Sequence, residues 1–139
     1  MVGIARNVID WSKRDHGLGV EDMDSTHAEL AALLNCIAQT KAPDDLQLLL
    51  DRLCDHTREH FARESSLMRE CGFKATDEHE AEHARVLGDL ERFARMSNRG
   101  MPLMAKAFVS DFLPGWFTMH LRTMDSALAQ CVKAHRRRR

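Results

Sequence analysis

Four long segments of the chain carry apolar residues three and four positions apart, and short breaks separate them. This spacing places the apolar side chains on one face of an α-helix. The breaks fall at Pro43, at Gly72 and over residues 98–102, where glycine or proline interrupts the pattern. The chain has no alternating segment of the kind that forms a β-strand, and no internal repeat. We therefore predict helices over about residues 22–41, 43–71, 76–98 and 103–135.

Local signals mark where these helices begin and end. Pro43, followed by two aspartates, is typical of a helix start, because acidic groups are favourable at the positive end of the helix dipole. Gly72 is a predicted C-cap, and Thr76 is a predicted N-cap of the third helix. Pro114 and Gly115 fall inside the fourth helix and should bend or divide it, with a bend favoured. On this helix the predicted inward-facing residues are Phe112, Trp116, His120, Met124, Ala127 and Cys131.

Four long helices joined by short loops favour an all-α fold, an up-down-up-down four-helix bundle. The first 20 residues show little periodicity and are expected to form an arm over the bundle, with Trp11 as its apolar anchor. We interpret residues 1–139 as a single domain. It comprises the arm over 1–20, the bundle over about 21–135 and a basic tail over 136–139. The tail is expected to be solvated and disordered.

Composition excludes several classes of protein. Five of the last seven residues are basic while the net charge is −1, so the positive charge forms a tail and not a nucleic-acid-binding face. No apolar run approaches the ~20 residues that cross a bilayer, and the N-terminus lacks the apolar core of a secretory signal. The cysteines show no metal-binding or redox spacing, and we interpret them as reduced, mostly buried thiols of a cytoplasmic protein. They are Cys36, Cys54, Cys71 and Cys131.

Five of the eight histidines, with two carboxylates, are distributed over all four predicted helices at spacings that suit metal binding. Residues four apart share a helix face and can bind one ion or two neighbouring ions. Seven oxygen and nitrogen donors are too many for a tetrahedral zinc ion and suit two ions that share carboxylate bridges. In chain order the candidates are His27, His60 with Glu64, His79 with His83, and His120 with Asp125.

The bundle topology allows these candidates to meet at one depth. The first and third helices begin at the end of the bundle where the second and fourth finish. At about 1.5 Å per residue, all seven candidates lie roughly 5–22 Å from that end. Unrelated histidines would have no reason to converge in this way.

Each group also has a simpler interpretation. The His60 and Glu64 pair could be exposed, but leucines on the same stripe favour an inward direction, where a carboxylate requires a cation. His27 alone would fit a core histidine. A separation of five residues puts His120 and Asp125 about 140° apart around an α-helix, which makes this group the weakest.

Two neighbouring residues have alternative roles. His56 lies one turn before His60 on the same stripe, and the two could form a ligand pair, but only His60 with Glu64 supplies a bridging carboxylate. We therefore expect His56 near the site and outside the ligand set. Asp24 could cap the first helix or hydrogen-bond to His27.

The candidates belong to longer motifs that occur in a fixed order along the chain. These read Asp24-x-x-His27-x-x-Leu30, His60-Phe61-x-x-Glu64-x-x-x-Met68, His79-x-x-x-His83 and Trp116-x-x-x-His120-x-x-x-x-Asp125. Over about residues 10–130 the pattern resembles hemerythrin, and most closely the single-domain bacterial hemerythrins. The resemblance implies two iron ions, one held by His79, His83 and His120, the other by His27 and His60. Glu64 and Asp125 would bridge them together with an oxo or hydroxo group, and the iron with two histidines would keep an open position.

The resemblance implies reversible O₂ binding, in oxygen storage, delivery or sensing, and not an enzyme. The alternatives are a diiron oxidoreductase acting on peroxide or nitric oxide, an iron-handling protein, or a structural bundle that holds zinc. The expected partner is O₂ or another small diatomic molecule, with no nucleic acid or membrane, and the sequence favours neither a monomer nor an oligomer. The candidate apolar wall around O₂ comprises Leu30, Phe61, Trp116, Phe117 and Leu121.

The chain departs from the family in having no tyrosine, whereas the family often places one near the centre. Leu128 lies one turn after Asp125 and cannot donate a hydrogen bond. We therefore expect a drier pocket, or a different choice of anions in the oxidised centre.

Overall fold

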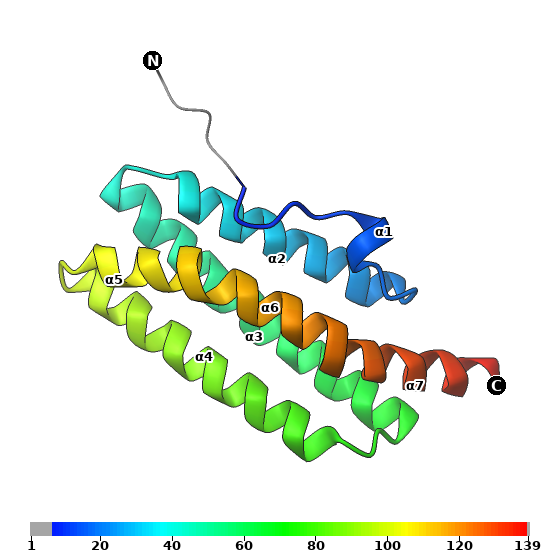
Figure 1. Cartoon of the computed structure of the whole chain (residues 1–139). Coiled ribbons are helices and arrows are strands. Elements are labelled where there is room, and N and C mark those ends of the chain that lie inside the picture. The colour runs from blue at the N-terminus through cyan, green and yellow to red at the C-terminus, as the bar shows by residue number, and fades with distance from the viewer. Residues whose placement is uncertain (1–6, 139) are drawn as a thin grey trace.

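Four helical rods make up the structure, a computed structural model that describes residues 7–138 (Figure 1). The first three rods are α2 (Glu21–Gln39), α3 (Pro43–Cys71) and α4 (Thr76–Asn98). The fourth runs through α5 (Pro102–Ala107), η1 (Phe108–Phe112), α6 (Leu113–His120), η2 (Leu121–Asp125) and α7 (Ser126–Arg137), where η denotes a π-helix. Successive rods run in opposite directions, so the predicted all-α, up-down-up-down bundle is confirmed.

The packing of the rods centres on α3, which contacts α2, α4 and α7. The fourth rod also contacts α4 through α5, and α2 through η1, so the rods enclose one interior. In the described part of the chain, no helix combines the length and apolar character that a membrane span requires.

The helix ends follow the predicted signals with one exception. Pro43 stands in the first turn of α3, and Gly72 adopts the left-handed conformation (φ 66°) of a C-cap and donates its amide to the carbonyl of Met68. The prediction that Thr76 is an N-cap is wrong, because it is the first residue of α4. Its hydroxyl donates to the carbonyl of Phe73 at 2.6 Å, and so it fastens the loop between α3 and α4.

The fourth rod contains two π-helical turns, and these shift its buried face. Pro114 is the second residue of α6, just after η1, and the amide of Leu113 donates to the carbonyl of Phe108, five residues earlier. The predicted inward face is wrong for Phe112 and Ala127, which are exposed. Each π-turn adds about one residue to a turn, so a pattern counted with the α-helical period loses register. On the fourth rod the buried residues are Ala105, Val109, Leu113, Phe117, His120, Leu121, Asp125, Leu128, Ala129 and Val132.

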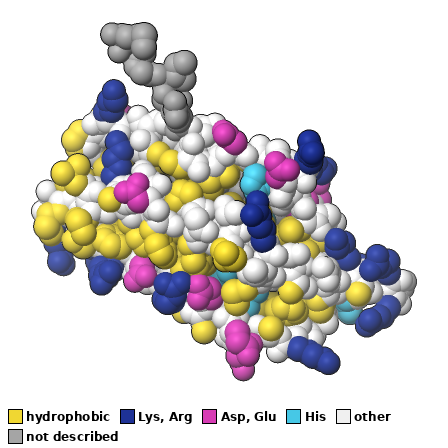
Figure 2. All heavy atoms as spheres, viewed as in Figure 1, with side chains coloured by type: hydrophobic (Ala, Val, Ile, Leu, Met, Phe, Trp, Pro, Cys, Tyr) yellow, Lys and Arg dark blue, Asp and Glu magenta, His cyan; other side chains and the backbone are white. Residues whose placement is uncertain are grey.

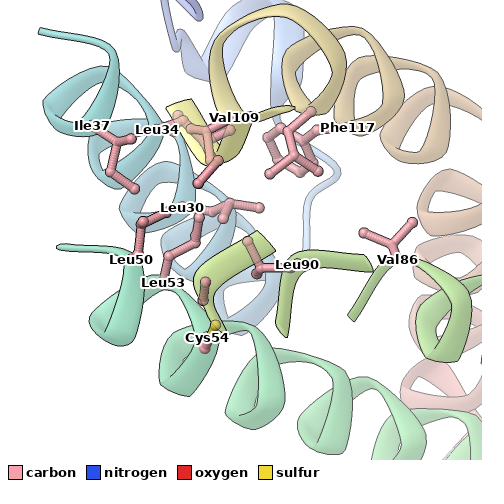
Figure 3. Close-up of a cluster of buried hydrophobic side chains, with 14 of the residues drawn as sticks. Leu30, Leu34, Ile37, Leu50, Leu53, Cys54, Val86, Leu90, Val109 and Phe117 are labelled. Carbon is pink, nitrogen blue, oxygen red and sulfur yellow. The ribbon is translucent and has the colours of Figure 1, made fainter. Parts of the chain in front are cut away.

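Two apolar clusters fill the bundle on either side of a polar layer. In the larger, Leu34 of α2 faces Leu50 and Leu53 of α3, with Leu90 of α4 beside them (Figure 3). The smaller cluster lies toward the other end of the rods and comprises Val20, Met23, Met68, Leu128, Ala129 and Val132. On each of α2, α3 and the fourth rod, a candidate metal ligand falls between residues of the two clusters.

The described part of the arm, residues 7–20, is tied to α2 by hydrogen bonds. It includes a short helix, α1 (Lys13–His16). The Asn35 side chain accepts the amides of Val8 at 2.8 Å and Ile9 at 3.0 Å. Trp11 is half-buried, packs against the larger cluster and stacks on His16 at 4.9 Å, in keeping with its predicted role as an anchor. Residues 1–6 of the predicted arm lie outside the described residues.

The basic tail begins as ordered helix. α7 extends to Arg137, and Arg136 donates to Glu70 of α3 at 3.2 Å, so the prediction of a disordered end is wrong for these residues. Figure 2 shows Lys and Arg side chains gathered where α7 ends. Arg139 lies outside the described residues.

The four cysteines have free thiols, as expected, but they differ in exposure. Cys54 is buried, Cys71 and Cys131 are half-buried, and Cys36 is exposed. The expectation of mostly buried cysteines is therefore wrong, since one of the four meets it.

Candidate metal centre

The seven candidate ligands, predicted from spacing alone, meet in the polar layer between the two apolar clusters. Each of the four rods contributes, and none of the seven residues is more than 4% exposed. The predicted convergence at one depth is therefore confirmed. That these residues bind metal stays a prediction.

The π-turn η2 brings the weakest predicted group into line. It occupies the residues between His120 and Asp125, and it includes Asp125. A π-helix closes its turn between residues five apart, so the two side chains project from the same side of the rod and not 140° apart. His120 Nε2 lies 3.1 Å from Asp125 Oδ1. A separation of five residues, which is unsuitable for shared metal binding on an α-helix, is thus suitable on this π-helical segment.

In both Glu64 and Asp125, one carboxylate oxygen faces one group of imidazoles and the other oxygen faces a second group. Glu64 Oε2 lies 2.7 Å from His60 Nε2 and 3.3 Å from His27 Nε2. Its other oxygen, Oε1, lies 3.0 Å from His79 Nε2 and 3.3 Å from His83 Nε2.

Asp125 repeats this division. Its Oδ2 lies 3.2 Å from His27 Nε2. Its Oδ1 lies 3.2 Å from His79 Nε2 and 3.1 Å from His120 Nε2. The two carboxylates therefore span two groups of imidazoles.

The donors accordingly fall into two overlapping sets, and within each set the donor atoms lie within 4.8 Å of one another. Both sets contain Glu64 and Asp125. The first set adds His79, His83 and His120, and the second adds His27 and His60. The division into three and two histidines is the one that the hemerythrin resemblance implied.

Unpaired polar atoms test whether the site suits cations. Within residues 7–138, neither oxygen of the buried Asp125 has a hydrogen-bond partner, although three imidazole nitrogens lie within 3.2 Å. Nε2 of His83 and Nε2 of His120 also approach to 3.1 Å. Within each set the donor atoms therefore share a small buried volume, in which the Asp125 oxygens form no hydrogen bond with the described residues. Such convergence of buried donors fits two cations and is therefore compatible with a diiron site.

Electrostatics support the same conclusion. Burial lowers the pKa of His27 and of His79, but contacts with Asp125 and Glu64 outweigh burial and raise both pKa values to about 9. Burial raises the pKa of Glu64, but the neighbouring histidines hold it well below its usual range. Without a cation, two imidazolium groups would thus neutralise the two carboxylates. A bound cation would take over this role and release their protons.

Aromatic rings surround the site. Phe61 stacks on His83 with ring centroids 3.7 Å apart, and Trp116 stacks on His120 at 4.6 Å. Phe117 meets His27 edge-on at 5.4 Å.

A small apolar cavity of about 20 Å³ adjoins the site. Four of the five predicted wall residues, Leu30, Phe61, Trp116 and Phe117, line it. The fifth, Leu121, is buried in the larger cluster and does not line this cavity. A role of these residues around O₂ stays a prediction.

The flanking residues were predicted less well. His56 lies outside both donor sets, as expected, and its Nε2 is 3.1 Å from Glu29. Asp24 is neither a cap nor a partner of His27, because it lies within α2 and accepts the amides of Leu18 and Gly19 from the arm. Glu82 was missed altogether. It accepts the indole N–H of Trp116 at 2.6 Å, and no spacing rule links these residues because they lie on different rods.

Comparisons with known proteins agree with this geometry. The model of the family described as hemerythrin HHE cation binding domain matches residues 18–132. Bacteriohemerythrin of Stenotrophomonas maltophilia is 29% identical over 128 residues, which are 87% of this chain and 80% of that protein. Bacteriohemerythrin of Aquifex aeolicus is 30% identical over 112 residues, 78% of this chain and 86% of that one. In fold, the chain is similar to the crystal structure of wild-type hemerythrin, with a TM-score of 0.77 at 23% identity over 89% of this chain and 97% of that chain.

Proposed function

Because this chain belongs to the hemerythrin family, we propose that its buried donors hold two iron ions and that the centre binds O₂ reversibly. The observation that carries the proposal is that each of the two carboxylates contacts both histidine sets. Glu64 and Asp125 each direct one oxygen to the three-histidine set and the other to the two-histidine set. Two bridging carboxylates over two nitrogen-rich sets suit a pair of iron ions.

The unequal sets suggest where the gas would bind. When bound, two iron(II) ions would supply the two electrons and the open coordination position that reversible O₂ binding needs. His27 and His60 offer one imidazole fewer than the opposite set, so the open position is expected on their side. The ring of Phe117 lies beside His27, and that of Phe61 beside His60. These apolar groups would exclude water and offer no proton to a bound gas.

The chain's own charges suit a resident cation pair. Glu64 and Asp125 carry two negative charges in a nearly solvent-free layer, and isolated buried carboxylates are costly. The five imidazoles would bind as neutral ligands once their protons leave. Leu30 and Trp116 extend the apolar surround on the larger-cluster side.

For the physiological role, we favour oxygen storage or delivery over sensing and over catalysis. The free thiols suit a reducing compartment such as the cytoplasm. An enzyme acting on peroxide or nitric oxide would need repeated delivery of electrons to the centre.

Anaerobic reduction followed by exposure to air tests the proposal, with iron content measured on protein purified without added metal. We expect two irons per chain and a visible absorption that appears with O₂, disappears under vacuum and returns with O₂. One-way bleaching, or catalytic consumption of added hydrogen peroxide, would replace carriage by an enzymatic function. Fewer than two irons, or zinc in their place, would contradict the proposal.

A further inference from the structure

His120 is oriented by ring stacking, while its hydrogen-bond contact, with His83 at 3.1 Å, is made by Nε2. Among the described residues its buried Nδ1 has no hydrogen-bond partner. Metal-binding histidines are usually oriented through this second nitrogen. Instead, the indole of Trp116, one turn earlier on α6, lies over the His120 ring with centroids 4.6 Å apart and planes inclined by 19°.

The indole itself is fixed from another rod. Nε1 of Trp116 donates to Oε1 of Glu82 on α4, at 2.6 Å. The same oxygen accepts a hydrogen bond from Arg85, also at 2.6 Å. Glu82 directly precedes His83, so this contact joins α4 to α6 beside the three-histidine set.

The neighbouring ligand candidate His83 shows what is particular to this arrangement. It also stacks on an aromatic ring, that of Phe61, at 3.7 Å. A phenylalanine ring has no polar atom through which another residue could direct it, whereas an indole has one donor. The plane of Trp116, and through it that of His120, can therefore depend on a third residue.

We propose that Glu82 is a positioning residue of the metal centre: its hydrogen bond fixes the Trp116 indole, which keeps the His120 imidazole directed at the metal. The inference rests on the proposed function only in requiring that the centre hold iron. A residue that orients a ligand changes metal retention, typically by tenfold or more.

The test compares Glu82→Ala with Glu82→Gln in the iron-loaded protein. In Glu82→Ala we expect release of iron(II) to a strong chelator to be about tenfold faster than in the wild type. Glutamine keeps an oxygen that can accept the indole N–H, so Glu82→Gln should release iron at close to the wild-type rate. The indole hydrogen bond is followed independently by its ultraviolet resonance Raman band, in a Trp11→Phe background that leaves Trp116 as the single tryptophan.

Two controls separate positioning from a general surface effect. Arg85→Ala removes the ion pair with Glu82 but leaves the indole contact, so iron release should not change. In a Trp116→Phe background, Glu82→Ala should have no further effect, because there is no N–H left to hold. The proposal is overturned if Glu82→Ala loses the Raman signature but keeps wild-type iron release, or if Arg85→Ala accelerates release equally.

These outcomes are distinct from failure of the proposed function. Iron retention and the indole band are measured without O₂, so a centre that holds iron but does not bind O₂ reversibly leaves the positioning proposal standing. Protein purified without iron would contradict the proposed function and, with it, the inferred role of Glu82 at an iron centre.

Discussion

The same four rods are held together in two different ways along their length. In the larger apolar cluster, the side chains of Leu34, Leu50 and Leu53 are fully buried against one another (Figure 3). These side chains have no polar atom that would require a hydrogen bond or a counter-charge. In the polar layer, residues as deeply buried, such as His27 and Asp125, carry polar atoms that lack hydrogen-bond partners among residues 7–138. Burial is equal in the two regions, but its energetic consequence is opposite.

The contrast separates the source of folding stability from the source of function. Burying an aliphatic side chain stabilises the fold by roughly 1.5–3 kcal/mol. Burying a carboxylate is unfavourable unless an opposite charge accompanies it. The apolar clusters should therefore hold the rods whether or not metal is present, while order within the polar layer depends on what neutralises Glu64 and Asp125. Each of the following predictions tests this separation.

The largest expected effect is loss of metal from the polar layer. In His79→Ala, the three-histidine set loses a nitrogen that lies 3.0 Å from Glu64 and 3.2 Å from Asp125. We expect at least one of the two irons and the whole O₂-dependent absorption to be lost, with helical content by circular dichroism retained. His135→Ala, on α7 and outside both donor sets, should change neither. Retention of two irons in His79→Ala would show that the ligand assignment is wrong.

Proton release gives the next largest effect. The pKa values of His27 and His79 are about 9 without metal, so both are protonated at neutral pH and must lose these protons when metal binds. Affinity for Zn²⁺, a redox-inert probe, should therefore rise by about 100-fold per pH unit up to about pH 8. Calorimetry in buffers of different ionisation enthalpy should report about two protons released per chain. Affinity that is independent of pH would contradict this charge arrangement.

The same pKa shifts define the stability of the metal-free protein. Because the folded-state pKa of His27 and of His79 is raised from 6.5, their contribution is fully present below pH 6.5 and is lost as pH rises toward 9. The pKa of Glu64 is lowered from 4.5, so its contribution is lost in acid. Urea unfolding should therefore give the highest free energy of unfolding between about pH 4.5 and 6.5.

A cavity made in the larger cluster should lower the stability of the fold and leave the metal content unchanged. Leu53 is fully buried, and Leu53→Ala should lower the free energy of unfolding by about 3 kcal/mol in urea titrations of the metal-free protein. The iron content of the folded protein should not change. Leu48→Ala is the matched control on the same helix, since Leu48 is 53% exposed and its loss should cost less than about 0.5 kcal/mol. If Leu53→Ala also lost iron, the two regions would not be separable.

Sequence patterns predicted both regions to different extents. The candidate ligands on α3 and α4 could be brought together from the sequence because residues four apart share one face of an α-helix. The apolar stripe of α2 was predicted correctly for the same reason. The fourth rod could not be predicted in register, because a π-turn leaves no signal in apolar spacing. As a result Phe112 was placed inside, and the alignment of His120 with Asp125 was underestimated.

Contacts between elements were beyond the reach of spacing rules. Asp24 accepts amides from the arm, and Glu82 accepts the indole of Trp116, in each case because the packing brings two segments together. Short polar side chains have many possible partners, and the chain alone does not rank them. The convergence of the seven candidate ligands could be predicted because the bundle topology places all of them at one depth.

The smallest expected effect concerns His56, which lies next to the candidate ligand His60 but outside both donor sets. It is on the same rod as His60, and the rings of the two are 6.2 Å apart, yet its Nε2 is directed at Glu29, whose side chain is 62% exposed. An exposed pair of this kind contributes about 0–1 kcal/mol. His56→Gln should therefore keep two irons and the full O₂-dependent absorption, with at most this small change in the free energy of unfolding. His60→Gln, one turn along the same face, should lose the metal of the two-histidine set. Loss of iron in His56→Gln would show that the metal centre includes a residue one turn closer to the larger apolar cluster.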